Sequence, residues 1–387
     1  MIVGIDAHNL EGNRTGVGRY LINLLQQWSK FKIEYQKSDI KFILYFKDKI
    51  PADLPKPSLA GPKSDLFESR LLKVGSTAKF IHWDLCRAAK KDKIDILFCP
   101  GYVAPVFFNG KIALVLHDII YEAHPQWFNW KSSADKILLK WVSRISARKA
   151  AVIFVPSDFS KKEVIKYYKV DSAKVVMIYD AADFGSSETG QSPESIKAKY
   201  GIKNEFVFYV GSIFNRRHLP AIISAFSRIA ADLPGLQLLL AGKNHTRPFQ
   251  DIDGSIQEIN NKLRRQAILR VDFINGYDYD LELLYSACAF FIWLSDYEGF
   301  GLPVLEALSA GAPVITSRKT SLIEVAGNAA FFIDNNLDDE EIYQAMKRII
   351  EDKNLRDELI KKGRDQAARF SWKKCAEETL DNLISKA

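Results

Sequence analysis

The sequence predicts an α/β protein built from two doubly wound, Rossmann-like domains. Two series of short, nearly unbroken apolar runs support this prediction, each run followed by a longer amphipathic stretch. Strands buried on both faces of a parallel sheet have this pattern. The chain has 387 residues, more than a single hydrophobic core usually serves. Its apolar fraction of 47% and charged fraction of 26% are those of an ordinary globular protein, so disorder is not indicated.

The predicted strands fall into an N-terminal and a C-terminal series. The first series is IVGI (2–5), KFILYF (41–46), DILFC (95–99), IALVLH (112–117) and AVIFVP (151–156). The second series is FVFYVG (206–211), LQLLLAG (236–242), VDFING (271–276), AFFIWLS (289–295) and APVITS (312–317). Ligands of doubly wound sheets bind at the carboxyl ends of the strands, so the residues after these runs are the candidates for a site.

A polar stretch over residues 180–197, DAADFGSSETGQSPESIK, has the composition of a linker. We therefore expect an N-terminal domain over residues 1–185 and a C-terminal domain over residues 186–370. Residues 371–387 are expected to form a helix. Its apolar face has residues at helical spacing: Trp372, Cys375, Ala376, Thr379, Leu380 and Leu383. The sequence leaves open which domain this helix packs on, and a return to the N-terminal domain is one alternative.

The net charge of +7 is modest, and it fits an anionic ligand or an anionic membrane face. Without a zinc spacing or a long basic block, the sequence does not favour nucleic acid as a partner. The cysteines are scattered along the chain: Cys86, Cys99, Cys288 and Cys375. They form no C-x-x-C pair, which favours a reducing compartment.

The opening MIVGIDAHNL does not have the pattern of a signal peptide, and the longest apolar run, AFFIWL (289–294), is too short to cross a bilayer. We therefore expect a cytoplasmic protein.

The strongest site signal is the segment EGFGLPVLE, from Glu298 to Glu306, which follows a predicted strand. Pro303 suits the first residue of a helix, where no N–H is needed. Gly299 and Gly301 leave the backbone uncovered. The N–H groups from Phe300 to Leu302 can then face an anion or a sugar at the positive end of that helix. The alternative is a surface loop followed by a capped helix.

The two carboxylates of this segment suit binding rather than nucleophilic catalysis. On one helix they would lie about 12 Å apart, whereas the carboxylates of a retaining hydrolase lie about 5 Å apart. Acidic residues bind ribose hydroxyls in dinucleotide folds. We therefore assign Glu306 to the ribose diol and Glu298 to hydroxyls of a transferred sugar.

Arg216 and Arg217 follow the strand predicted at 206–211, within YVGSIFNRRHLP. Two adjacent cations at a strand end can neutralise a diphosphate and stabilise the charge that grows on a leaving group. The alternative is a solvated basic turn.

Two further candidates follow strands of the N-terminal half. Gly16 and Gly18, in TGVGR, open a predicted helix, although a lone G-x-G also occurs in turns that merely need glycine. His117 ends the run at 112–117, and Asp118 follows it. The alternative is a histidine of the core and an aspartate that caps the next helix.

These segments resemble the retaining family-4 glycosyltransferases with the GT-B fold, whose E-x7-E motif matches Glu298 to Glu306. The resemblance covers nearly the whole chain. The matching segments are 4–21, 116–128, 155–168, 276–291 and 306–334. It implies two domains facing across a cleft, the N-terminal one for the acceptor and the C-terminal one for a nucleotide sugar.

The resemblance also implies roles for single residues. His117 would contact the sugar near the reacting carbon, and the backbone at Gly16 and Gly18 would approach the donor phosphates or the acceptor. The phosphate-binding P-R-K-N of the family reads N-R-R-H here, so Arg217 replaces lysine and His218 replaces asparagine. The charge is kept, but a planar fork replaces a point charge. The sequence offers no obvious carboxylate nucleophile, which agrees with the family's front-face mechanism.

The opening segment resembles bacterial mannosyltransferases of polysaccharide assembly. This favours GDP-mannose as the donor, with UDP-sugars as the alternative, and a growing glycan, lipid-linked or free, as the acceptor. Two different hypotheses stay open: a GT-B epimerase or phosphorylase, and a non-catalytic sugar-nucleotide or glycan-binding module. A dehydrogenase is disfavoured because no complete G-x-G-x-x-G follows a strand.

No metal or other cofactor is predicted. D-x-D tripeptides occur at 251–253 and 278–280, but Asp280 suits a helix cap, and Arg216 and Arg217 can supply the positive charge.

A basic helix face is expected from residues four apart: Lys136, Lys140, Arg144 and Arg148. Beside it lies an apolar set: Ile137, Leu138, Trp141, Val142 and Ile145. Such a helix can contact an acceptor or lie on anionic lipid, or it can simply have a solvated face.

Overall fold

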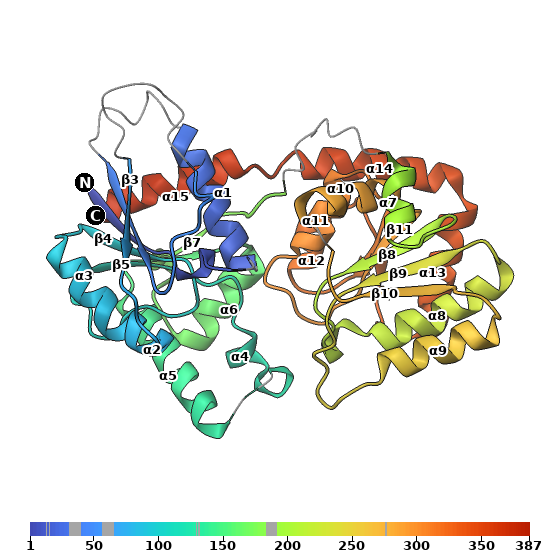
Figure 1. Cartoon of the computed structure of the whole chain (residues 1–387), viewed down its shortest axis with the longest axis horizontal. Helices are drawn as coiled ribbons and strands as arrows, with labels where there is room; N and C mark the ends of the chain where they lie inside the picture. Colours follow the sequence, from blue (N-terminus) through green and yellow to red (C-terminus); the bar gives the residue numbers. More distant parts are fainter. Residues whose placement is uncertain are drawn as a thin grey trace. The chain divides into compact units, whose positions relative to one another are not determined.

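The computed structural model describes residues 1–12, 14, 16–30, 40–55, 66–128, 130, 132–182, 192–274 and 277–387. These residues divide into two compact units (Figure 1). Unit 1 is Met1–Asp180 with Ser371–Ala387, and unit 2 is Ala181–Phe370. The division falls after Asp180, whereas the sequence placed a boundary between 185 and 186. Residues 183–191 lie outside the described part of the chain.

Within the described residues, unit 1 contains a parallel sheet in the order β3-β2-β1-β4-β5-β6-β7. Its strands are β1 (Ile2–Asp6), β2 (Lys41–Phe46), β3 (Phe67–Leu71), β4 (Ile96–Cys99), β5 (Lys111–Val115), β6 (Val152–Val155) and β7 (Val175–Met177). The winding runs outward in both directions from β1 and β4, so the strand order reverses between these two strands.

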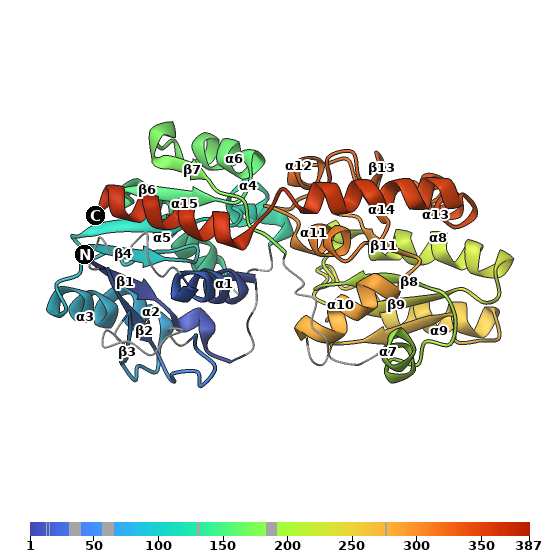
Figure 2. The same cartoon turned by 90° about the horizontal axis from the view of Figure 1, so that it is seen from above.

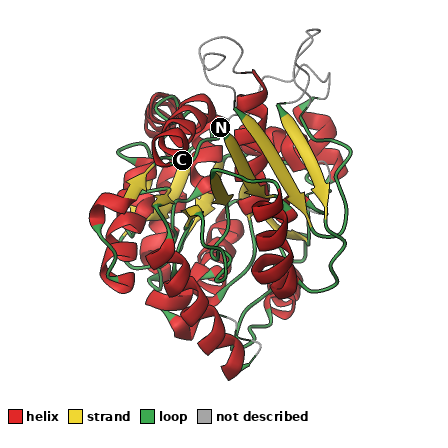
Figure 3. Ribbon diagram, turned by 90° about the vertical axis from the view of Figure 1, so that its left-hand side faces the viewer, coloured by secondary structure: helices red, strands yellow, loops and turns green. Residues whose placement is uncertain are grey.

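Helices cover both faces of this sheet (Figure 3). They are α1 (Gly16–Lys30), α2 (Thr77–Lys79), α3 (Leu85–Lys91), α4 (Ile120–Ala123), α5 (Ser133–Lys149), α6 (Asp158–Tyr168) and α15 (Trp372–Lys386). Successive strand residues point to opposite faces. Phe98 meets Trp28 of α1 with ring centroids 6.2 Å apart, whereas Leu97 belongs to the core under α3, α5 and α6.

The C-terminal helix α15 belongs to unit 1 and lies beside α1 (Figure 2). Its buried residues are those whose spacing predicted the helix. The Trp28 indole N–H donates to the carbonyl of Ala376 at 2.9 Å, so a buried polar group of α1 is satisfied by the end of the chain.

Unit 2 has a second parallel sheet, in the order β10-β9-β8-β11-β12-β13. Its strands are β8 (Phe206–Val210), β9 (Gln237–Ala241), β10 (Ile268–Val271), β11 (Phe290–Trp293), β12 (Val314–Ser317) and β13 (Phe331–Ile333). Its helices are α7 (Pro193–Lys199), α8 (Leu219–Asp232), α9 (Ile252–Lys262), α10 (Tyr277–Ala287), α11 (Leu302–Ser309), α12 (Ser321–Ala326), α13 (Asp339–Glu351) and α14 (Lys353–Ala367). The order reverses between β8 and β11.

The predicted fold class is confirmed, with one strand misplaced and three missed. The prediction of a strand at 271–276 is wrong, because β10 ends at Val271 and the half-buried Arg270 interrupts its apolar run. The missed strands have no apolar run long enough to predict them: β3 is a partly exposed edge strand, and β7 and β13 have three residues each.

Candidate active site

The reversal of strand order in unit 2 brings two loops together. Ligands of doubly wound sheets bind at such a reversal, outside the carboxyl ends of the strands. The loop after β8 contains Arg216 and Arg217 in a single 3₁₀ turn, and the loop after β11 contains Glu298. Because β8 pairs with β11, three residues that the sequence predicted separately lie at one sheet edge.

Arg217 and Glu298 form an ion pair. The Arg217 Nε donates to Glu298 Oε1 at 3.1 Å, and Nη2 lies 3.5 Å from Oε2. The guanidinium also donates to the carbonyl of Ser212 at 2.5 Å and stacks 4.2 Å from the ring of Trp293. The two side chains are only 12% and 13% exposed, so a planar cation is held firmly beside a carboxylate.

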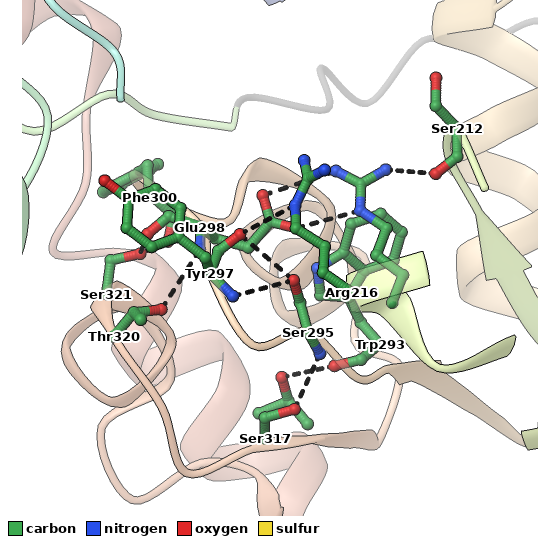
Figure 4. A network of polar contacts seen from close by, with 12 residues as sticks. Ser212, Arg216, Trp293, Ser295, Tyr297, Glu298, Phe300, Ser317, Thr320 and Ser321 are labelled. Atoms are coloured by element: carbon green, nitrogen blue, oxygen red, sulfur yellow. Dashed lines mark hydrogen bonds and ion pairs between the residues drawn. The ribbon is translucent and has the colours of Figure 1, made fainter. Parts of the chain in front are cut away.

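Arg216 is fixed to the loop that contains Glu298 (Figure 4). Its Nε donates to the carbonyl of Tyr297 at 3.4 Å, and its guanidinium lies 4.4 Å from the ring of Phe214. The backbone N–H of Asp296 donates to the Arg216 carbonyl at 3.0 Å. Both arginines therefore belong to one network with the segment from Asp296 to Glu298.

The surroundings of Glu298 favour its ionised form. Burial raises the pKa of its carboxyl, but the charges of Arg217 and Arg216 and the hydrogen bond from Arg217 outweigh burial, so the pKa lies below its ordinary value.

The turn after Glu298 depends on one glycine and two hydroxyls. Gly301, the N-cap of α11, has φ +114°, and a Cβ there would lie 2.7 Å from a methyl of Leu322. The Ser321 hydroxyl lies 2.8 Å and 2.7 Å from the carbonyls of Glu298 and Phe300, and Thr320 Oγ1 accepts from the Glu298 N–H at 3.3 Å. Pro303 is the second helical residue rather than the first.

Glu306 lies in different surroundings from Glu298. It is on α11, it is 1% exposed, and its Oε2 accepts from the Tyr285 hydroxyl of α10 at 3.1 Å. Its carboxylate is therefore buried between α10 and α11.

In unit 1, His117 follows β5 and packs against Tyr20, with ring centroids 4.9 Å apart. Its Nε2 lies 3.2 Å from the Pro100 carbonyl and its Nδ1 lies 3.8 Å from Asp180 Oδ2. Asp118 accepts from the Ile120 N–H at 3.1 Å at the start of α4. The sequence did not single out Asp180, which follows a strand too short to be predicted.

Gly16 and Gly18 begin α1, and Thr15 before them lies outside the described residues. Among the described residues, no heavy atom lies within 4 Å of a Cβ built on Gly16, whereas a Cβ on Gly18 would come 2.4 Å from the carbonyl of Asn9. Packing therefore explains the glycine at 18 but not the glycine at 16.

The basic residues of α5 divide between a buried carboxylate and the surface. Arg144 and Lys140 both bind Glu122, which is 5% exposed, and Lys136 lies 6.0 Å from the ring of Trp130. Arg148 is exposed. Two residues of the expected basic face, Lys140 and Arg144, are thus paired with a carboxylate of the same unit. Three of its apolar neighbours face solvent, with exposed fractions of 70%, 56% and 56%: Ile137, Leu138 and Trp141.

The D-x-D tripeptides are engaged in other contacts. Asp251 caps α9, and Asp253 pairs with Arg270. The prediction that Asp280 is a helix cap is wrong: α10 begins three residues earlier, at Tyr277, and the buried Asp280 carboxylate accepts from Lys199 and Tyr200. In the described part of the chain, no three His, Cys, Asp or Glu side chains gather as metal ligands would.

Two family models match the chain. The model of glycosyl transferases group 1 matches residues 192–366, and the model of glycosyltransferase family 4 matches residues 14–184. The O-antigen chain mannosyltransferase B of Escherichia coli is 30% identical over 379 residues, which are 95% of each protein. The chain belongs to the group 1 and family 4 glycosyltransferases, which have the GT-B fold.

Two other similarities are less complete or more distant. The serotype-specific mannosyltransferase WbdA of Escherichia coli is 33% identical over 61% of this chain, which spans only 29% of WbdA. The crystal structure of HepE from Anabaena, in complex with UDP and glucose, aligns with a TM-score of 0.71 and 15% identity over 99% of both chains. This second similarity supports the fold alone.

Among the described residues, no helix combines the length and apolar character needed to span a membrane.

Proposed function

We propose that the chain transfers mannose from GDP-mannose to a growing glycan, with retention of the anomeric configuration. The observation behind this proposal is the group formed by Arg216, Arg217 and Glu298 at the strand reversal of unit 2. It combines cations for a diphosphate with a carboxylate for sugar hydroxyls. The names of two relatives, both mannosyltransferases, favour mannose over the sugars of UDP donors.

In unit 2, the diphosphate would take over the hydrogen bonds that Arg217 now gives to Glu298. Phosphate oxygens match the planar fork of an arginine, and two cations would stabilise the leaving nucleoside diphosphate. Glu298, freed from Arg217, would accept from hydroxyls of the sugar. The N–H groups at the turn Gly299–Leu302 would meet the anion at the positive end of α11. Glu306 would bind the ribose diol after its carboxylate turns from Tyr285.

In unit 1, His117 would contact the sugar near the reacting carbon, and the backbone at Gly16 and Gly18 would approach the donor or the acceptor. The leaving phosphate would take the acceptor proton as the acceptor oxygen bonds to the anomeric carbon and the carbon–phosphate oxygen bond breaks. The new bond would then form on the face that the phosphate leaves, which retains the configuration.

The reaction is proposed to need no metal ion, because Arg216 and Arg217 supply positive charge where the diphosphate would lie. Adding EDTA should leave the rate unchanged. Loss of activity that Mg²⁺ or Mn²⁺ restores would contradict this part of the proposal.

Contact with an anionic membrane, at its cytoplasmic face, is proposed through α5, whose first turns lie at the periphery of unit 1 (Figure 1). The exposed Ile137, Leu138 and Trp141 would enter the headgroup region beside Arg144 and Arg148. Vesicles with phosphatidylglycerol should co-sediment the wild type. Serine at the three apolar positions should abolish this binding, whereas serine at the exposed Leu337 of unit 2 should not.

A transfer assay tests the function directly. GDP-mannose and UDP-glucose are each supplied with lipid-linked and free mannan oligosaccharides, and the product anomer is determined by NMR. We expect an α-mannoside from GDP-mannose. Turnover of UDP-glucose alone would replace the donor, a β-mannoside would overturn retention, and donor binding without turnover would favour a non-catalytic binding module.

A further inference from the structure

Asp296 lies where four loops of unit 2 meet. Its side chain is 19% exposed, and its carboxylate binds one side chain from each of the loops after β8, β12 and β13. His218 Nε2 lies 2.5 Å from Oδ2, while Lys319 Nζ and Asn336 Nδ2 donate to Oδ1 at 2.6 Å and 3.0 Å. Asp296 itself follows β11, so one carboxylate joins the carboxyl ends of four strands.

The backbone around Asp296 is also hydrogen-bonded to Arg216. Its N–H donates to the Arg216 carbonyl at 3.0 Å, and the next residue, Tyr297, accepts from Arg216 Nε at 3.4 Å. Glu298 follows directly. The segment that binds His218 and Lys319 through its side chain therefore also fixes Arg216 through its backbone.

The hydroxyls beneath this segment extend the same network. The Ser317 Oγ at the end of β12 accepts from the Ser295 N–H at 2.8 Å and donates to Asn336 Oδ1 at 2.7 Å. Asn336 in turn donates to Asp296. The carboxylate thus rests on a buried chain of hydrogen bonds, which can hold its position more tightly than isolated contacts would.

Charge explains why an acidic residue is needed here. His218, Lys319, Arg216 and Arg217 all belong to two loops at one sheet edge. Burial raises the pKa of Asp296, but hydrogen bonds from His218 and Lys319 and their charges outweigh burial, so the pKa lies well below its ordinary value. An ionised carboxylate at this place offsets the positive charge of Lys319, which would otherwise act on the arginines.

His218 is suited to its part in this arrangement. It has φ +48° and is the N-cap of α8, a left-handed position that histidine and asparagine tolerate better than most residues.

We propose that Asp296 is a positioning residue for the donor site: it holds His218 and Lys319 so that Arg216, Arg217 and Glu298 keep the arrangement that receives the donor diphosphate. Asp296 itself does not touch the donor. The inference rests on the proposed function, because it assumes that the arginines bind a nucleoside diphosphate.

The test compares Asp296→Asn with Asp334→Asn. Asp334 is a matched control, because it binds Arg318, the neighbour of Lys319, in an exposed pair at 2.8 Å. Isothermal titration with GDP and with UDP gives the affinity of each protein, and steady-state kinetics give KM and kcat for donor and acceptor. Asp296→Asn should raise the Kd of the bound nucleotide and the donor KM about 10- to 100-fold, with the acceptor KM unchanged. Asp334→Asn should match the wild type.

A second variant serves if Asp296→Asn does not fold. His218→Asn keeps a residue that accepts the left-handed cap and removes the imidazole contact, and it should raise the nucleotide Kd about threefold. Affinities within twofold of wild type in the folded variants, or a rise in acceptor KM instead of donor KM, would overturn the positioning role while the proposed function stands. A wild type that binds neither GDP nor UDP would overturn the proposed donor site, and the inference with it.

Discussion

The strand ends of unit 2 and unit 1 share a topology but differ in chemistry. In unit 2, Arg216 and Arg217 lie against Glu298, within a dense set of charged hydrogen bonds. In unit 1, His117 lies against the ring of Tyr20, with its nitrogens near one carbonyl and one carboxylate. The same doubly wound topology therefore presents two different sets of side chains, because the residues after the strands differ between the units. Cations suit a diphosphate, while an imidazole among aromatic rings suits a sugar.

The largest expected effect is that of Arg217→Met, which removes one of the two arginines proposed to bind the diphosphate in unit 2. Donor turnover should fall about 10²- to 10³-fold, because the leaving diphosphate loses a fixed charge. The unfolding free energy should also fall by about 3 kcal/mol, because Glu298 is left buried without its partner. The control is Arg228→Met, whose exposed pair with Glu340 lies away from the strand ends. A turnover loss equal to that of the control would contradict the role of Arg217.

Glu306→Ala is the next largest test, and it separates ribose binding from packing. The donor Kd should rise about 10- to 100-fold through lost charge-assisted hydrogen bonds. Tyr285→Phe removes the partner hydroxyl but keeps the carboxylate, so it should leave donor affinity near the wild-type value. Unchanged affinity in Glu306→Ala would refute the ribose role and leave Glu306 as a residue of the helix interface.

Lowering the pH should reduce the stability that Asp296 and Glu298, at the strand ends of unit 2, contribute to the folded chain. Asp296 and Glu298 have pKa values below the ordinary carboxyl range in the folded chain, so their contribution to stability is present above about pH 4 and is lost as pH falls. Urea unfolding between about pH 6 and about pH 2.5 should show the wild type losing about 2 kcal/mol more than Asp296→Asn. Parallel losses in the two proteins would contradict the assignment of this stability to Asp296.

The smallest expected effect belongs to unit 1. His117→Ala should lower kcat about tenfold while the Kd of GDP stays unchanged, because the contact proposed for the imidazole is with the sugar and not with the diphosphate. A weaker GDP affinity in this variant would contradict the assignment of diphosphate binding to unit 2 alone.

The sequence predicted those elements whose characteristic residues all lie within one short segment of the chain. Strands buried on both faces appear as unbroken apolar runs, and the segment from Glu298 to Glu306 has its glycines and proline within nine residues. β10 was misplaced because Arg270 interrupts its apolar run.

Contacts between distant segments were beyond the reach of local patterns. Asp296 gains its importance from Lys319 and Asn336, which follow other strands and become its neighbours only when the sheet forms. The enclosure of Glu306 depends on the hydroxyl of Tyr285 on another helix. Spacing placed Ile137 and Trp141 on an apolar face of their helix, but it could not tell whether that face is covered.

The central claim is that unit 2 binds a nucleotide sugar through its arginines, and a thermal-shift screen tests it most directly. The wild type and Arg217→Met are heated with GDP-, UDP-, ADP- and dTDP-sugars, with NAD as the control. A ligand at about a hundred times its Kd adds about 2.7 kcal/mol of stability. We expect a rise in Tm with GDP-mannose for the wild type and a much smaller rise for Arg217→Met. No rise with any nucleotide sugar, or a rise with NAD alone, would contradict the claim.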